Sequence, residues 1–314
     1  MKVARMCVEV CADVKRGEDV FIVTDTNYTR IGDALAQACR NADAETILAI
    51  MSPRKMHGNK PPKIIAAAMK TADAIFAATT YSMAHTDAMV DAGRAGARAI
   101  IMRGITEEML VRGAINADYA YVKKRTEKIA ARLSSASNVH VWSDCGTDTR
   151  MSLEARKAFV LAGFATEPGT FAAFPDGEAA ISPVEGTAEG TIVFDHTMDG
   201  IGRLREPIQL EVSKGKVIQI GGGEQADKLR KIVEASDNGA TNIAEFAIGT
   251  NPEALLIGNM AEDKKREGTV HVAIGDNHRL GGTVTSSIHL DGLMVLPTVK
   301  LDGETIIKKG KLLI

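Results

Sequence analysis

The sequence predicts an α/β protein with two domains: an N-terminal, doubly wound parallel α/β domain (1–138) and a C-terminal, mostly antiparallel β domain of α+β type (139–314). Up to about residue 138, β-branched apolar runs alternate with amphipathic helical segments, as in βα units around a parallel sheet. Beyond that point apolar and polar residues alternate with a period of two, and Gly and Asp mark the turns. The length of 314 residues fits two domains.

Each element of the first domain follows from local signals. We expect its strands at 19–25, 44–51, 73–79 and 97–103 and its helices at 30–43, 61–72, 84–96, 106–115 and 121–137. Prolines near the start of the segment 61–72 suit the first turn of a helix. The helix at 106–115 begins with a capping threonine and two first-turn glutamates, which favour a helix N-terminus.

The second domain has weaker helical signals. One helix is expected at 225–236, between strands that alternate in period two. The last seventeen or so residues, from Thr298 onward, predict a hairpin, because Asp302-Gly303 is a favoured two-residue turn.

Composition excludes several classes of function. The chain is 45% hydrophobic and 25% charged, which is enough apolar material for a sizeable core. A net charge of −2 without a basic block argues against nucleic-acid binding. No apolar run approaches the roughly 18 residues of a membrane span, and no signal peptide is evident. Four cysteines without a CxxC pair fit reduced thiols, so we expect a cytoplasmic protein.

Two short C-terminal segments carry the strongest functional signal. His289 and Asp291 are two residues apart in a strand-like run, so their side chains point to the same face. His271 lies in a second strand-like run, which a hairpin can bring alongside. Two imidazoles and a carboxylate form a recurrent metal-binding set. The alternative is that the pair simply lies on the solvent face of a strand.

Two carboxylates strengthen the metal hypothesis. Glu245 interrupts an apolar run, where a buried carboxylate needs a partner or a metal. Glu178 follows a Pro-Asp-Gly turn at the start of a strand, a common support for a functional side chain. We therefore predict one metal-binding cleft in the second domain, formed by Glu178, Glu245, His271, His289 and Asp291.

With these residues the second domain resembles the aminopeptidase T/aminopeptidase S family of metallopeptidases. The segments PDGE, AEFAIGTNPEA, GTVHVAIG and IHLDG stand in that family's order, and the resemblance spans roughly 140–305. It implies that the five residues bind two divalent metal ions, such as Zn, Co, Mn or Mg. It also implies a metal-dependent hydrolase that cleaves a small peptide or amide with a metal-bound hydroxide. Its catalytic residues would be Glu178 and His278, the latter at the position of a family tyrosine.

The chain also resembles the 2,5-dihydroxypyridine dioxygenase family. HVWSDCGTD, GFATEPG, SPVEGTAEGT and the junction that carries His85 are similar to segments of that family. This resemblance implies a single Fe(II) held by two His and one Asp, the first His lying where this chain has Glu245. Because that position is a carboxylate and Glu178 and His271 are also present, the ligand set favours the two-metal hydrolase. A ring-cleaving dioxygenase is the alternative, and a binding protein on a degenerate scaffold is a third possibility.

Three further residues are candidates for substrate binding. His85 follows a predicted parallel strand, where doubly wound sheets place ligands. Arg203 and Arg205 can recognise a substrate carboxylate, although both also suit a solvated strand edge. We expect a small-molecule or short-peptide substrate, no nucleic-acid or membrane partner, and a homodimer. Its interface would cover edge strands of the β-rich half.

Overall fold

The computed structural model describes residues 2–56, 58–84 and 86–314, and the chain forms two compact units. The first unit comprises Met1–Tyr119 and Leu161–Asp176, and the second comprises Ala120–Val160 and Gly177–Ile314. The sequence instead predicts a single division at residue 138. The difference arises because strand β8 (Phe171–Ala173) completes the sheet of the first unit. Helix α5 (Tyr119–Ser135) in turn contributes Ile129 and Leu133 to the core of the second.

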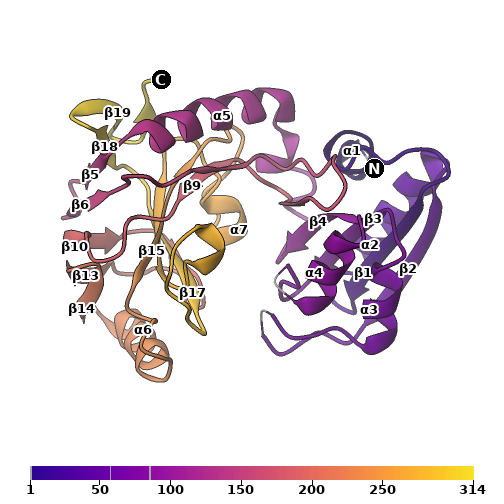
Figure 1. The fold of residues 1–314 in the computed structure, drawn as a ribbon, viewed down its shortest axis with the longest axis horizontal. Coiled ribbons are helices and arrows are strands. Elements are labelled where there is room, and N and C mark those ends of the chain that lie inside the picture. Colours follow the sequence, from indigo (N-terminus) through magenta and orange to yellow (C-terminus); the bar gives the residue numbers. More distant parts are fainter. Residues whose placement is uncertain (1, 57, 85) are drawn as a thin grey trace. The chain divides into compact units, whose positions relative to one another are not determined.

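The first unit contains a parallel five-stranded sheet in the order β2-β1-β3-β4-β8. Figure 1 labels the first four of these strands. The predicted strands are observed as β1 (Asp19–Asp25), β2 (Glu45–Met51), β3 (Ala74–Thr79) and β4 (Arg98–Arg103). Helices cover both faces of this sheet. Ile65 of α3 (Lys63–Met69) and Met89 of α4 (Asp87–Arg94) join the core cluster formed with Phe21 and Val23 of β1. On the other face, Gly32 of α2 (Thr29–Asn41) lies against Thr24 and Leu48.

The helix predicted at 106–115 does not form. The segment is a series of turns, followed by a 3-10 turn at Ala114–Asn116. Thr106 caps the first turn as expected, because its Oγ1 accepts a hydrogen bond from the Met109 amide at 3.2 Å. Gly113 then adopts φ +91°, a left-handed conformation that ends regular helical winding.

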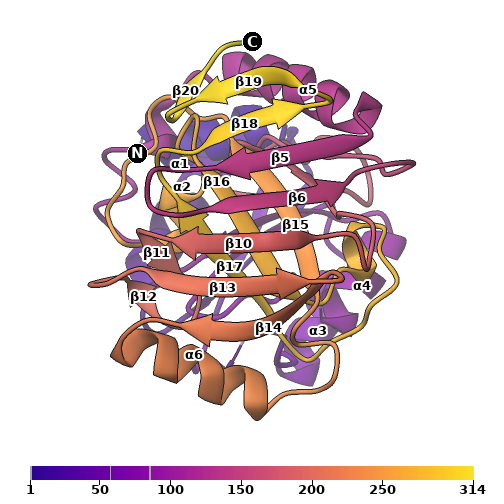
Figure 2. The same cartoon turned by 90° about the vertical axis from the view of Figure 1, so that its left-hand side faces the viewer.

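The second unit packs two antiparallel sheets against each other (Figure 2). The eight-stranded sheet consists, in spatial order, of β14 (Lys216–Gly221), β13 (Ile208–Ser213), β10 (Glu189–Phe194), β6 (Asp148–Ser152), β5 (Asn138–Trp142), β18 (Thr298–Leu301), β19 (Glu304–Lys308) and β20 (Lys311–Leu312). The seven-stranded sheet consists of β12 (Gly202–Arg203), β11 (Thr197–Met198), β17 (His289–Met294), β16 (Val270–Gly275), β15 (Ile243–Gly249), β9 (Glu178–Ile181) and β7 (Phe159–Leu161).

The remaining predicted elements of this unit are present. Helix α6 (Glu224–Glu234) packs against β14 and β13, close to the predicted range. The terminal hairpin joins β18 to β19 through Asp302 and Gly303, both with positive φ as this turn requires. Within the described residues, no helix combines the length and the apolar character that crossing a membrane requires.

The main core fills the space between the two sheets. Phe194 and Leu210 of the eight-stranded sheet pack there with Phe246, Val272 and Met294 of the seven-stranded sheet. Since side chains alternate along a strand, the seven-stranded sheet has a second face that points away from this core. The five residues predicted to bind a metal lie on that second face.

Candidate metal centre

Four neighbouring strands bring the predicted ligands together on the outer face of the seven-stranded sheet. The contributing strands are β9 with Glu178, β15 with Glu245, β16 with His271, and β17 with His289 and Asp291. Neighbouring residues of opposite parity, such as Phe246 and Val272, point into the core instead. The convergence expected for the five residues is therefore observed.

A β-bulge in β15 determines the direction of Glu245. Ile243 pairs with Ile274 and Glu245 pairs with Ala273, so one extra residue is inserted between them. Ile243 faces the core. Without the bulge, Glu245 would share the face of Ile243, because residues two apart point the same way. The bulge reverses the alternation and places this carboxylate on the outer face.

A small residue leaves room for the centre. Ala273 of β16 pairs with Glu245 on one side and with Asp291 on the other. The two carboxylates therefore lie on the two strands that flank β16. At the usual strand spacing the Cα atoms of Glu245 and Asp291 are roughly 10 Å apart. A methyl group between them lets both side chains reach over β16 toward the same point.

Glu245, His289 and Asp291 have the spacing of ligands on one ion. The His289 Nε2 atom lies 3.0 Å from Glu245 Oε2 and 3.2 Å from Asp291 Oδ1. Adjacent ligands of an octahedral ion with bonds near 2.1 Å are about 3.0 Å apart. The three donor atoms all lie within 4.8 Å of one another.

The second ring nitrogen of His289 is also fixed. Its Nδ1 lies 2.7 Å from the carbonyl oxygen of Asp276, which can only accept, so Nδ1 carries a hydrogen. Burial lowers the pKa of His289, but hydrogen bonds and charges from Asp291 and Glu245 raise that pKa well above its ordinary value. The metal-free ring therefore holds a proton on Nε2, and an ion would replace this proton.

A second group shares Glu245 with the first. Glu178, Glu245 and His271 also offer donor atoms within 4.8 Å of one another. The His271 Nε2 atom lies 3.2 Å from Glu245 Oε1 and 3.6 Å from Glu178 Oε2. Two overlapping groups around one carboxylate have the layout of a two-metal centre.

Unpaired buried atoms mark the cluster as a cation site. Among the described residues, the carboxylate oxygens Glu178 Oε2 and Asp291 Oδ1 are buried and lack a hydrogen bond of good geometry. Leaving such atoms without a partner is unfavourable unless a cation satisfies them. A divalent metal ion therefore fits the residues present here.

Two lysines that the sequence analysis did not single out complete the cluster. The Lys264 Nζ atom lies 2.9 Å from Asp291 Oδ2 and 3.2 Å from Glu178 Oε1, and Lys265 Nζ lies 2.9 Å from the same Glu178 oxygen. Burial raises the pKa of Glu178, but the positive charges of Lys264, Lys265 and His271 together lower it, and the net pKa is lowered. The pKa of Asp291 is likewise lowered, because Lys264 and His289 outweigh the effect of burial. In the sequence these lysines resemble an ordinary solvated pair in MAEDKKREG.

The other predicted site residues are not part of this cluster as it is described. His278 is exposed on a 3-10 turn (His278–Leu280). Arg203 and Arg205 are exposed on and after β12, and Gln225 holds their backbone through hydrogen bonds to Arg203 O and from Arg205 N. His85 lies outside the described residues.

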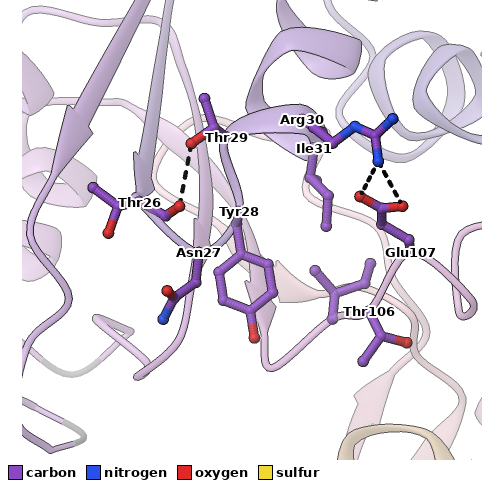
Figure 3. Close-up of a pocket in the computed structure, with 9 residues that line it drawn as sticks. Thr26, Asn27, Tyr28, Thr29, Arg30, Ile31, Thr106 and Glu107 are labelled. Atoms are coloured by element: carbon purple, nitrogen blue, oxygen red, sulfur yellow. Dashed lines mark hydrogen bonds and ion pairs between the residues drawn. The ribbon is translucent and has the colours of Figure 1, made fainter.

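The first unit contains a separate pocket of about 490 Å³ (Figure 3). It lies beyond the carboxyl ends of β1 and β4 and is lined by Thr26, Asn27, Tyr28, Thr29, Arg30, Ile31, Ile105, Thr106 and Glu107. Parallel sheets commonly bind ligands at this edge. The charged groups of the lining pair with each other, since Arg30 Nη1 lies 3.0 Å from Glu107 Oε1. The titratable cluster of the second unit is therefore the stronger candidate site.

Comparison with known proteins separates the two predicted families. Residues 2–314 match the family model NicX, 2,5-dihydroxypyridine 5,6-dioxygenase. The 2,5-dihydroxypyridine 5,6-dioxygenase of Pseudomonas putida is 28% identical over 206 residues, which cover 60% of this chain and 57% of the relative. The aligned part is thus little more than half of that relative's length.

Two solved structures share the fold. The 2,5-dihydroxypyridine dioxygenase of Pseudomonas putida superposes with a TM-score of 0.84 at 21% identity, covering 99% of this chain and 96% of that one. Wild-type AmpT from Thermus thermophilus superposes with a TM-score of 0.70 at 16% identity, covering 100% and 98%.

These findings overturn the prediction of an aminopeptidase-like metallohydrolase. The match over nearly the whole chain is to an oxidoreductase family, whereas AmpT is a match of fold. The hydrolytic roles given to Glu178 and His278 lose their basis. The error has a chemical cause: carboxylates and imidazoles bind metal ions in both kinds of enzyme, so ligand types do not determine the reaction.

Proposed function

The chain belongs to the 2,5-dihydroxypyridine 5,6-dioxygenase family, and on this premise we propose that it is an iron-dependent, ring-cleaving dioxygenase. Its substrate would be a dihydroxylated pyridine or a closely similar hydroxylated nitrogen heterocycle. The reaction inserts both atoms of dioxygen while one ring bond breaks. This proposal takes up the alternative that the sequence offered.

We propose Glu245, His289 and Asp291 as the protein ligands of one Fe(II). The observation that carries this assignment is the spacing of 3.0 and 3.2 Å around His289 Nε2. Three ligands on one side of an ion are typical of non-haem Fe(II) oxygenases, although two imidazoles and one carboxylate are more usual. When bound, ferrous iron supplies the one-electron chemistry that dioxygen requires.

The surrounding residues prepare these ligands. The Asp276 carbonyl holds the His289 ring with Nε2 toward Glu245 and Asp291. The His271 ring, buried in β16, offers its Nε2 to Glu245 Oε1 and so fixes the direction of that carboxylate. Partners of this kind typically change metal affinity or activity by about 10- to 100-fold.

The charge of the centre suits an anionic ring. Three carboxylates face two lysines, and a single divalent ion would leave the cluster with a net positive charge. A dihydroxylated aromatic ring loses a hydroxyl proton readily at a positive centre, because the charge stabilises the resulting oxyanion. The substrate would therefore bind as an anion.

The test uses metal-free protein reconstituted anaerobically with Fe(II). We expect 2,5-dihydroxypyridine to lose its ring absorbance while one dioxygen is consumed per ring. His289→Gln should lose tight iron binding and turnover. His140→Gln is the matched control, since His140 pairs with Asp148 on the eight-stranded sheet and should leave both unchanged. Iron bound in one equivalent without oxygen uptake on any dihydroxypyridine isomer would contradict the proposal.

A further inference from the structure

The cluster of Glu178, Glu245, His271, His289 and Asp291 has the ligand groups for two ions, but two lysines lie against its carboxylates. The groups Glu178, Glu245, His271 and Glu245, His289, Asp291 share one carboxylate. Glu178 belongs only to the first group, and both lysine ammonium nitrogens lie within 3.2 Å of its Oε1. The cations beside Glu178 are thus supplied by the chain itself.

We propose that Lys264 and Lys265 replace a second metal ion and restrict the cluster to one divalent ion at Glu245, His289 and Asp291. The lysines neutralise Glu178 permanently, which leaves this residue as a structural counter-ion. This inference rests on the metal site proposed above, but it does not depend on the reaction that the ion supports.

The lysines are held in place by their backbone. They follow α7 (Met260–Asp263) directly, and this helix contacts β17 and β11. Figure 1 shows α7 beside β17. The Lys265 amide donates to Glu262 O at 3.0 Å, and the Lys265 carbonyl accepts from Asn251 N at 2.9 Å. The segment is therefore anchored on both sides of the two side chains.

The turn before α7 is also anchored by a buried carboxylate. Asp263 is fully buried, and its Oδ1 accepts from the Ile257 amide at 2.7 Å. Its Oδ2 accepts from Thr197 Oγ1 of β11 at 2.5 Å. These bonds tie the start of the lysine segment to the sheet, and the burial of Lys265 leaves its ammonium group little room to withdraw when a second ion approaches.

Electrostatics then disfavours a second ion. An ion bound to Glu178 would lie within about 7 Å of both ammonium nitrogens, given metal–oxygen bonds near 2 Å. Two like-charged neighbours at this range are only weakly screened, because Lys265 is 3% exposed and Glu178 is 2% exposed. The site at His289 is less affected, since only Lys264 contacts one of its ligands.

The experiment is a titration of metal-free protein with Mn(II), followed by calorimetry and by metal analysis after gel filtration. Wild-type protein should bind one Mn(II) per chain. The double variant Lys264→Met/Lys265→Met should bind two, with the second ion at least about 100-fold tighter than any second ion on the wild type. Lys309→Met is the matched control, because Lys309 pairs with the exposed Asp144. It should bind one.

Two further variants keep the test decisive if the double variant folds poorly. Lys264→Met alone, at a partly exposed side chain, should admit a second ion with intermediate affinity. Glu178→Gln should still bind one ion per chain, because Glu178 pairs with the lysines rather than with that ion. Two ions on the wild type, or one ion on a folded double variant, would overturn the inference. Absence of oxygenase activity would leave these stoichiometries untouched and would count only against the proposed function.

Discussion

Gly292 is the position at which a single methyl group should perturb the second unit most directly. It lies in β17, next to Asp291, on the face that packs against the eight-stranded sheet. A Cβ at this position would lie 2.4 Å from Cδ2 and Cε2 of Phe194 and 2.5 Å from its Cγ. Side-chain carbons normally approach to about 3.5–4.0 Å, so the ring or the strand must move by about 1 Å.

The magnitude of the effect follows from the burial of Phe194. This ring is fully buried between the two sheets and has no open space into which it can turn. Overpacking of a well-packed core costs typically about 1–3 kcal/mol, and we expect Gly292→Ala to lie at the upper end. In a unit of this size, about 3 kcal/mol corresponds to a fall in Tm of roughly 6–12 °C.

Thermal and urea unfolding of metal-free protein measure this change. Gly221→Ala is the matched control: this strand glycine also has an ordinary φ, and its Cβ would meet nothing closer than 3.9 Å. A second variant, Phe194→Leu, removes the collision partner. Phe194→Leu should destabilise the Gly292→Ala variant less than it destabilises the wild type. The interaction free energy in this double-mutant cycle should be about 1–2 kcal/mol. A Tm of Gly292→Ala within 1–2 °C of the control, or strict additivity in this cycle, would refute the reasoning.

Three other predictions concern the metal centre. Glu245→Gln should weaken Fe(II) or Mn(II) binding by roughly 10²-fold in calorimetry, because roughly 10–16 kcal/mol for a structural zinc site, divided over four ligands, is about 3 kcal/mol per ligand; unchanged affinity would exclude Glu245 as a ligand. Ala273→Leu should fold but lose metal binding, because the leucine side chain would fill the space between Glu245 and Asp291. Normal metal content in this variant would show that the ion does not bind in that space. In metal-free protein, the raised pKa of His289 stabilises the fold fully below about pH 6.5, and this contribution disappears as pH rises through the raised folded-state pKa. The urea midpoint should therefore fall above pH 6.5, and His289→Gln should flatten that part of the profile.

Sequence patterns were sufficient to predict site residues whose arrangement depends on a single strand. The i, i+2 spacing of His289 and Asp291 predicted a shared face, and both side chains are on it. Glu245 was identifiable because a carboxylate in a fully buried strand requires partners, and it has two imidazoles. Strands β1 to β4 of the first unit were equally clear, because each is a run rich in apolar residues.

Other parts of the site depend on packing that no local pattern encodes. The bulge before Glu245 is visible only in the pairing of β15 with β16. Lys264 and Lys265 look like surface charges until α7 is placed over the sheet. The three-residue strand β8 is too short to predict, and the strands before and after it in the sequence, β7 and β9, belong to the seven-stranded sheet of the other unit.

The interleaved path of the chain has a consequence for biosynthesis. The parallel sheet lacks its last strand until β8 has left the ribosome, by which time α5, β5 and β6 of the other unit have already been made. Until then the edge of β4 is unpaired, and an open edge can pair with a second nascent chain. The same connectivity means that a fragment cut at residue 138 would keep α5 but lose β8. A continuous piece of the chain that holds one whole unit must therefore include part of the other unit as well.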